Sequence, residues 1–202
     1  MSKNSMDPRV RRTRLALQNA MKAVALERDY ETVTISDLTS RAGVNRATFY
    51  QHFKGKEDLL ASIIEDLILV MSEETARFVA DVPDFRSPVA PPFLVALFLR
   101  VEQESDFYSK LLGRGGSAFM RDQMLRYLEQ LIGMHVTRLP EAVPIAGRIL
   151  GVPPTLTARI LASGLLGSLT WYLENARFFS AEDAAAWTWN MQGMAPWERR
   201  IE

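Results

Sequence analysis

The sequence predicts an all-α fold, with a three-helix head that contains a helix-turn-helix followed by a larger helical bundle, about nine helices in total. Three observations support this prediction. Apolar residues recur at intervals of three and four in almost every segment of the 202 residues, which is the spacing of one helix face. No segment alternates apolar and polar residues between hairpin turns, as a pair of strands would. Hydrophobic residues make up 48% of the chain, which is enough for a substantial core.

The first predicted helix spans about residues 9–28. Its apolar face consists of Leu17, Ala20, Met21 and Val24, which stand at positions i, i+3, i+4 and i+7. The segment ERDYETV, which begins at Glu27, interrupts this spacing, so we expect the helix to end there.

Two short helices follow, separated by a tight turn. Thr34 and Asp37 have the spacing of a capping box, which predicts that a helix begins after Thr34. The sequence AGV then provides Gly43, which can adopt the positive φ angle of a tight turn. Asn45 is a favourable N-cap for the next helix, which is predicted to run through Phe53.

The rest of the chain is predicted to form the bundle. Gly55 ends the third helix, and a long apolar-rich helix runs from Lys56 toward Ala80. Further helices are predicted at about residues 92–104, 106–112, 116–138 and 154–178, and a last one from residue 181 opens with a capping box of Ser180 and Asp183. Irregular segments rich in proline separate them at 81–92 and 139–154.

Composition excludes several kinds of site. The chain has no cysteine, so disulfides and thiolate metal sites are excluded, and two histidines, His52 and His135, argue against a histidine-rich metal site. We therefore expect no metal and no cofactor. The first fourteen residues are polar and basic, unlike a signal peptide. The longest apolar run, 156–173, contains Arg159, which favours a buried helix over a membrane span. A soluble cytoplasmic protein without membrane contact is expected.

The formal net charge of zero conceals an asymmetry. Residues 1–60 contain 11 Lys and Arg against 7 Asp and Glu, whereas residues 61–202 contain 13 against 17. A basic head on an acidic body indicates a polyanion as the partner of the head, although a charged face can also serve only for solvation.

The surface of the predicted helix 45–53 is the most informative feature of the sequence. At about 100° per residue, Phe49 and Phe53 share one face, which is predicted to point inward. The other face and the helix tip carry polar side chains and one small residue, namely Asn45, Arg46, Ala47, Thr48, Tyr50, Gln51 and His52.

This set of side chains suits double-stranded DNA. A helix fits the major groove, where Gln can read adenine, Arg can read guanine and the methyl of Ala can contact thymine. Thr48, Tyr50 and His52 can donate to phosphate oxygens. Lys56 and Thr34 stand at helix starts, where a phosphate is favoured. The alternative is a capped helix pair on a bundle surface, with Tyr50 and His52 as packing residues. The capping box, the turn, the polar face and the local positive charge together favour DNA binding.

The segment TISDLTSRAGVNRATFYQHFKGKEDLL, with the helix before it, resembles the DNA-binding head of the TetR family of bacterial regulators over about residues 10–62. The matching positions are Gly43, Val44, Thr48, Tyr50, His52, Phe53, Lys56 and Leu59. The resemblance implies a homodimer on a palindromic operator, with an N-terminal DNA-binding domain at 1–55 and a C-terminal ligand-binding and dimerisation domain at 56–202.

The resemblance also implies roles for individual residues. It assigns phosphate contacts to Thr34, Thr48, Tyr50, His52 and Lys56. It assigns base reading to Asn45, Arg46, Ala47 and Gln51. Arg46 and Gln51 occupy variable positions of the family's motif, so the bases that they read do not carry over.

The C-terminal region is similar to one subgroup of TetR-type proteins, in which a G-L-x-G and W-x-L-E-N helix precedes the last helix. Some members of this subgroup, which includes dihydroxyacetone-kinase-type regulators, work with a protein partner. The resemblance therefore leaves two kinds of effector open, a small molecule and a partner protein.

Two further groups of residues are candidates in the body. Ser163, Gly164, Gly167 and Ser168 form a small-residue patch, to which we add Trp171; it predicts a dimer interface, or else close packing within one subunit. Phe93, Phe98, Phe107, Phe119, Met120, Met124 and Tyr127 are candidates for an apolar ligand pocket, with Tyr127, His135 or Arg121 as polar handles, or else for ordinary core.

The predicted function is a dimeric, sequence-specific transcriptional regulator, a repressor, whose operator affinity is set allosterically by a small molecule in the body. The alternative is a DNA-binding regulator or activator controlled by a partner protein rather than by a metabolite. An enzyme is a remote alternative, because the glycine-rich segment GRGGS at 113–117 lacks the strand and the Lys-Ser/Thr ending of a phosphate loop, and no catalytic residues stand out.

Overall fold

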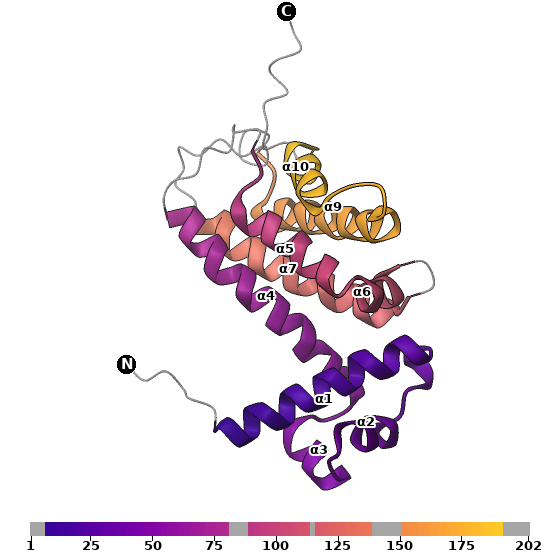
Figure 1. Ribbon diagram of the computed structural model, residues 1–202. Helices are drawn as coiled ribbons and strands as arrows, with labels where there is room; N and C mark the ends of the chain where they lie inside the picture. The colour runs from indigo at the N-terminus through magenta and orange to yellow at the C-terminus, as the bar shows by residue number, and fades with distance from the viewer. Residues whose placement is uncertain (1–6, 81–88, 114–115, 139–150, 192–202) are drawn as a thin grey trace, which may run out of the picture.

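The computed structural model describes residues 7–80, 89–113, 116–138 and 151–191, and within these ranges the chain is helical without any strand. Figure 1 shows a small head of three helices below a larger body. The helices are α1 (Pro8–Glu27), α2 (Ile35–Ala42), α3 (Arg46–His52), α4 (Lys56–Ala80), α5 (Pro92–Gln103), α6 (Ser105–Leu112), α7 (Ala118–Arg138), α9 (Pro154–Asn175) and α10 (Ala181–Met191), with a short 3-10 turn, η1 (Tyr30–Thr32). The prediction of an all-α fold with about nine helices is confirmed for the described residues.

Local signals explain where the helices of the head begin and end. The hydroxyl oxygen of Thr34 accepts from the backbone N–H of Asp37 at 3.2 Å, and the carboxylate of Asp37 accepts from the backbone N–H of Thr34 at 2.9 Å. The hydroxyl of Thr34, which donates to the Asp37 carboxylate, and then the backbone N–H of Thr34 hold the pKa of Asp37 below its ordinary value. Gly43 ends α2 with φ of 68°, in the left-handed region that favours glycine. The capping box and the turn that the sequence predicts are therefore present.

Two details differ from the prediction. Helix α9 ends at Asn175, before the expected limit at residue 178. The segment after α1 contains the turn η1, whose Thr32 hydroxyl donates to the carbonyl oxygen of Asp29 at 2.8 Å. Most of both irregular segments expected from the sequence, residues 81–88 and 139–150, lies outside the described residues, as do residues 114 and 115 of the glycine-rich segment.

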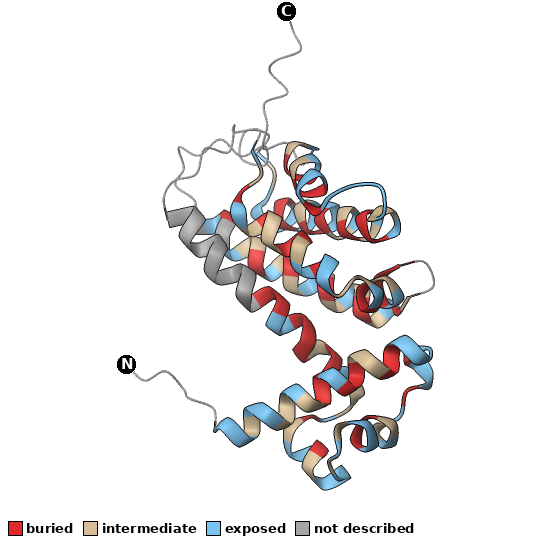
Figure 2. Cartoon of the chain, in the orientation of Figure 1, coloured by how far each residue is buried: buried red, intermediate tan, exposed pale blue. Residues whose placement is uncertain are grey.

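Helix α4 belongs to both parts of the molecule. It packs against α1 of the head and against α5 and α7 of the body. Buried side chains follow one another along it, from Leu59 and Leu60 through Ile63 and Ile64 to Leu67 and Ile68, and Figure 2 shows this buried stripe. The domain boundary expected between residues 55 and 56 falls at the first residue of this shared helix, and it stays a prediction.

The body is a layered bundle in which α7 packs against α4 and α9, and α10 packs against α5. The ring of Phe98 on α5 meets the ring of Tyr172 on α9 edge to face, at 5.5 Å between centroids. The hydroxyl of Tyr172 donates to Glu102 at 2.5 Å, and burial raises the pKa of this tyrosine. None of the described helices is long and apolar enough to cross a membrane.

Candidate nucleic-acid interface

Helix α3 is anchored from behind by two phenylalanines and one arginine. Phe49 and Phe53 are buried, with ring centroids 5.9 Å apart. The guanidinium of Arg14 on α1 lies 4.6 Å from the centre of the Phe53 ring, and its Nη1 donates to the carbonyl oxygen of His52 at 3.4 Å. Helix α1 therefore fixes the C-terminal end of α3, a contact that the sequence alone does not indicate.

The outward face of α3 carries the side chains that the sequence places there. Asn45, Arg46, Ala47, Tyr50 and Gln51 are exposed, and Thr48 and His52 are half-buried. Tyr50 is 51% exposed although its ring stands edge-on to Phe49 at 5.5 Å, so the buried ring supports the exposed one. Within the described residues, the side chains of Arg46, Tyr50 and Gln51 have no hydrogen-bond partner and are free to contact another molecule.

Asn45 serves the fold as well as the surface. Its side-chain oxygen accepts from the backbone N–H of Thr48 at 2.7 Å, which caps α3. The capping bond leaves both donors of the amide nitrogen, and one lone pair of the oxygen, for contact with a base.

Thr34 and Lys56 are both engaged within the head. The hydroxyl of Thr34 donates to Asp37 at 2.7 Å. The ammonium of Lys56 donates to the carbonyl oxygens of Tyr30 and Glu31, each at 3.0 Å, and lies 4.7 Å from the centre of the Tyr30 ring. Because an ammonium has three donors, one remains for a phosphate. Lys56 therefore fastens η1 to the start of α4, a role that sequence reasoning missed because these residues are 25 positions or more apart.

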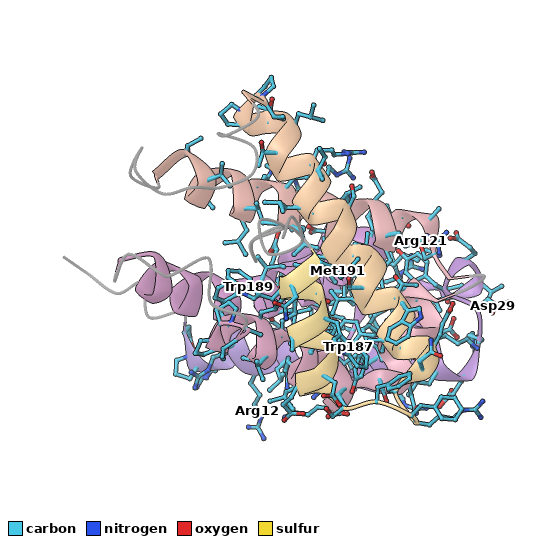
Figure 3. The ribbon with its side chains drawn as sticks, turned by 90° about the horizontal axis from the view of Figure 1, so that it is seen from above. Arg12, Asp29, Arg121, Trp187, Trp189 and Met191 are labelled. Carbon is cyan, nitrogen blue, oxygen red and sulfur yellow. The ribbon has the colours of Figure 1, made fainter. Side chains whose placement is uncertain are left out.

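Helix α1 adds arginines to the head that the motif does not include. Arg9, Arg11 and Arg12 are exposed, and in the described part of the chain their side chains have no ion-pair partner. A groove of about 740 Å³ runs beside them, lined by Pro8, Arg11, Arg12, Arg14, Leu15, Gln18 and Asp66; Figure 3 labels Arg12 at the edge of the molecule. These arginines could have been included in the predicted DNA surface, because the sequence shows a run of basic residues after Asp7.

The predicted dimer face lies on α9 beside α10. Ser163, Gly164 and Gly167 are exposed, Ser168 is half-buried, and Trp171 is 43% exposed. A groove of about 480 Å³, here called the α9–α10 groove, is lined by Gly164, Gly167, Ser168, Trp171, Ala184, Trp187, Thr188 and Met191. The structure thus brings four of the five predicted residues together and adds α10, on which Figure 3 labels Trp187 and Met191.

Exposed aromatic rings continue from this groove. Phe179 stacks on Trp171 at 5.4 Å between centroids and meets Trp187 edge to face at 5.2 Å. Trp187 is 44% exposed and Met191 is 84% exposed, which is unusual for such large apolar side chains at one place. Sequence reasoning included only Trp171 of this set.

The residues predicted to line a ligand pocket are mostly packed in the core. Phe98, Phe107, Met120 and Met124 are buried, and Phe93, Phe119 and Tyr127 are half-buried against the same core. Their role in ligand binding stays a prediction.

Two of the three predicted polar handles of that pocket also have partners. Arg121 donates to the carbonyl oxygen of Gly116 at 2.9 Å. Tyr127 donates to Glu65, and burial and this bond raise the pKa of Tyr127 to about 12. The side chain of His135 lies outside the described residues. In the part of the chain that the structure describes, no group of three His, Asp or Glu residues could hold a metal ion.

Residues 19–63 match the profile of the family described as "Bacterial regulatory proteins, tetR family". A curated relative, the uncharacterised HTH-type transcriptional regulator YxbF of Bacillus subtilis (strain 168), is 49% identical over 61 residues, which are 30% of this chain and 16% of that protein. The match thus spans about a sixth of that relative. The similarity to the tetR family therefore covers the head, at residues 19–63.

Solved structures resemble the whole chain. A TetR transcriptional regulator from Streptococcus agalactiae 2603V has a TM-score of 0.64 at 24% identity, over 92% of this chain and 96% of that chain. The dihydroxyacetone kinase operon activator DhaS has a TM-score of 0.57 at 19% identity, over 89% and 93%. A SmeT–triclosan complex has a TM-score of 0.62 at 22% identity, over 90% of each. Identities this low show the fold alone, so they leave the expected subgroup unconfirmed.

Tyr50 and Lys56 are expected to differ in their effect on stability. Tyr50→Phe should leave the free energy of unfolding unchanged within about 0.5 kcal/mol, because its hydroxyl has no partner in the described residues. Lys56→Met should lower it by about 1 kcal/mol, because two carbonyl oxygens lose their donor. Urea unfolding of both variants checks this. Equal stability of Lys56→Met and the unchanged protein would show that its two hydrogen bonds contribute nothing.

Proposed function

We propose that this chain is a dimeric, sequence-specific DNA-binding transcriptional regulator of the TetR type, a repressor located in the cytoplasm. The exposed polar face of α3, held from behind by Phe49 and Phe53, is the observation that supports this most strongly. A helix of this shape and polarity fits the major groove of DNA. The match of residues 19–63 to the TetR profile supports the same function.

The residues of the head divide into two roles in this proposal. Arg46, Ala47 and Gln51 read bases, together with the amide nitrogen of Asn45. Thr48, Tyr50 and His52 contact phosphates from α3, and Lys56 does so from the start of α4 with its remaining donor. Thr34 does so from the start of α2, where a phosphate oxygen replaces the Asp37 carboxylate as the acceptor of its hydroxyl proton. The exposed positions of the first group and the free hydroxyl of Tyr50 support this division.

Gln51→Ala and Tyr50→Phe should separate base reading from phosphate contact. An operator is first selected from a random-sequence duplex pool with the unchanged protein. At one position of the operator the unchanged protein should prefer one base pair, and Gln51→Ala should lose this preference. The difference in binding free energy between the preferred base pair and the others should fall by about 1–3 kcal/mol at that position. Tyr50→Phe should weaken binding to all sequences alike and leave the slope of log K against log salt concentration unchanged, because a neutral hydroxyl neutralises no phosphate and releases no counterion.

Fluorescence anisotropy with the operator and its single-base variants, across a salt series, measures both effects. Arg126→Gln on α7 is the matched control, because this exposed residue lies in the body and pairs only with Asp122 among the described residues. Uniform weakening by Gln51→Ala would contradict its role in base reading. Absence of any selected operator would contradict the proposed function, as would turnover of a nucleic acid.

The dimer interface in this proposal is the α9–α10 groove with its exposed aromatic rings. A two-fold dimer must present two recognition helices about 34 Å apart, one helical turn of DNA. The small residues of α9 allow a close approach of two helices, and Trp171, Trp187 and Met191 supply apolar area to bury. These observations favour an interface over packing within one subunit, because the residues are open in the single chain.

Gly167→Ala gives a direct test of this interface. A Cβ at this position meets nothing within 4 Å in the single chain, so in a monomer Ala should stabilise α9 by about 1 kcal/mol. If a partner helix packs there, the added methyl group should instead weaken dimerisation by about tenfold, or 1.4 kcal/mol. Gly133→Ala is the control, because its Cβ would meet Ala158 at an ordinary 3.7 Å. Sedimentation equilibrium measures dimerisation, and unchanged association of Gly167→Ala would exclude this contact.

Control by a small molecule in the body completes the proposal. Helix α4 packs against the body helices α5 and α7, so a ligand among Phe93, Phe98, Phe107, Phe119, Met120, Met124 and Tyr127 would move the shared helix. The SmeT–triclosan complex is a small-molecule complex within the same fold. The dense packing of Phe98, Phe107, Met120 and Met124 favours a second candidate, control by a partner protein that requires no cavity.

Fractionated cell extract should distinguish the two kinds of effector. The small-molecule filtrate should release the protein from its operator and raise the free energy of unfolding by about 2.7 kcal/mol at a hundredfold excess of ligand over Kd. Release by the retained macromolecular fraction alone would support the partner protein and contradict the small molecule. Anisotropy with the operator and thermal unfolding are the two measurements.

A further inference from the structure

A cluster of charged side chains joins the head to the body. Lys22 on α1 lies with its ammonium 2.6 Å from one carboxylate oxygen of Glu104, the residue between α5 and α6. The other oxygen of Glu104 lies 3.1 Å from Nη2 of Arg100. The Lys22 and Glu104 side chains are only 23% and 22% exposed. A pair this shielded from water is less screened than the other ion pairs of the surface.

A second set of polar contacts joins α1 to α4 beside this cluster. Nε2 of Gln18 donates to the carboxylate of Asp66 at 2.6 Å and to the hydroxyl of Ser62 at 3.1 Å. Gln18 is 7% exposed, so these hydrogen bonds are largely protected from water. Because Gln18 and Lys22 are four residues apart, one face of α1 makes both contacts.

A buried tyrosine lies among these charged groups. Tyr108 on α6 is 2% exposed, and its burial raises the pKa of its hydroxyl. The negative charges of Glu104 and Asp66 raise this pKa further, whereas the positive charge of Arg100 lowers it. The ammonium of Lys22 also lies 5.9 Å from the centre of the Phe107 ring. We call Gln18, Lys22, Ser62, Asp66, Arg100 and Glu104 the head–body clamp.

The clamp differs in kind from the apolar packing around it. Apolar contacts are not directional and permit small rotations of one helix against another. Hydrogen bonds such as that of Gln18 with Asp66 have preferred distances and angles, and the carboxylate of Glu104 holds the charged groups of Lys22 and Arg100 at short separations. The clamp therefore restricts the angle between α1, which carries the head, and the α5–α6 junction of the body.

We propose that Glu104 is a positioning residue for operator recognition. By holding Lys22, it fixes the angle of each head on its body and so selects the spacing between the two half-sites of the operator. The inference rests on the proposed dimeric DNA-binding function. Neither residue belongs to the predicted DNA surface, so the effect operates through the orientation of the head.

The geometry of DNA makes this effect measurable. Each added base pair shifts the second half-site by about 3.4 Å and turns it by about 35°, since one helical turn of about 34–36 Å holds 10–10.5 base pairs. A dimer with fixed heads should discriminate sharply between spacings. A dimer with pivoting heads should accept neighbouring spacings with little loss.

Lys22→Met and Glu104→Gln remove the charge pair while keeping side chains of similar size. The probes are the operator selected by the unchanged protein, the same operator with one or two base pairs added or removed at its centre, and a duplex with a single half-site. The unchanged protein should lose about tenfold in affinity for a change of one base pair, the scale of a single mismatch. Both variants should lose less than about threefold, while their affinity for the single half-site stays the same.

Two further variants separate positioning from a merely structural role. Lys22→Arg keeps the charge and should restore the sharp dependence on spacing. Asp122→Asn removes an exposed ion pair within α7, 2.7 Å in the native chain, and should leave the dependence unchanged. Thermal unfolding of every variant accompanies the binding series, because a purely structural pair would lower stability and half-site affinity without changing the spacing profile.

The possible results are distinct. The inference is supported if the operator affinity of Lys22→Met and Glu104→Gln depends less on the half-site spacing while their affinity for the single half-site is unchanged. It is overturned if their affinity depends on the spacing as that of the unchanged protein does, and the proposed function then still stands. Failure of the unchanged protein to select any operator overturns both.

Discussion

The shared helix α4 is the constraint on which the rest of the structure depends. Its first turns bury Leu59, Leu60, Ile63 and Ile64, and it continues into contact with α5 and α7 of the body. Because one rigid rod supplies part of the core on both sides, the head cannot move without moving a body helix. The start of this rod is fastened to the head by Lys56, which holds the carbonyl oxygens of η1. The architecture thus makes the position of α3 a property of the whole chain.

The surface of the head combines folding and recognition in the same residues. Asn45 caps α3 through its side-chain oxygen, Thr34 closes the capping box of α2, and Lys56 ties a turn to α4. Thr34 and Lys56 therefore retain fewer free donors, and Asn45 less acceptor capacity, than an isolated side chain would have. Tyr50 and Gln51 have no such task in the described residues and remain open. The side chains of the head that could contact another molecule without giving up a hydrogen bond are therefore fewer than the motif implies.

Local signals account for what the sequence could predict. The capping box at Thr34, the turn at Gly43 and the cap at Asn45 each depend on residues within three or four positions, and all are present. Contacts over long separations could not be predicted, such as Arg14 with His52 or Trp187 beside Trp171. Nor can apolar spacing distinguish a filled core from a cavity, because Phe98 and Met124 satisfy either description.

The last turn of α5 lies where these long-range contacts meet. Tyr172 on α9 donates to Glu102, and two residues later Glu104 holds Lys22 on α1. The first contact is with α9, which carries the small-residue face, and the second contact is with α1, which belongs to the head. The short segment 102–104 thus carries both a hydrogen bond to α9 and an ion pair to α1. Coupling between distant sites requires an element with two discrete arrangements, and this polar turn at the edge of the apolar core can supply them, since the hydrogen bond of Tyr172 with Glu102 and the ion pair of Lys22 with Glu104 are each either made or broken.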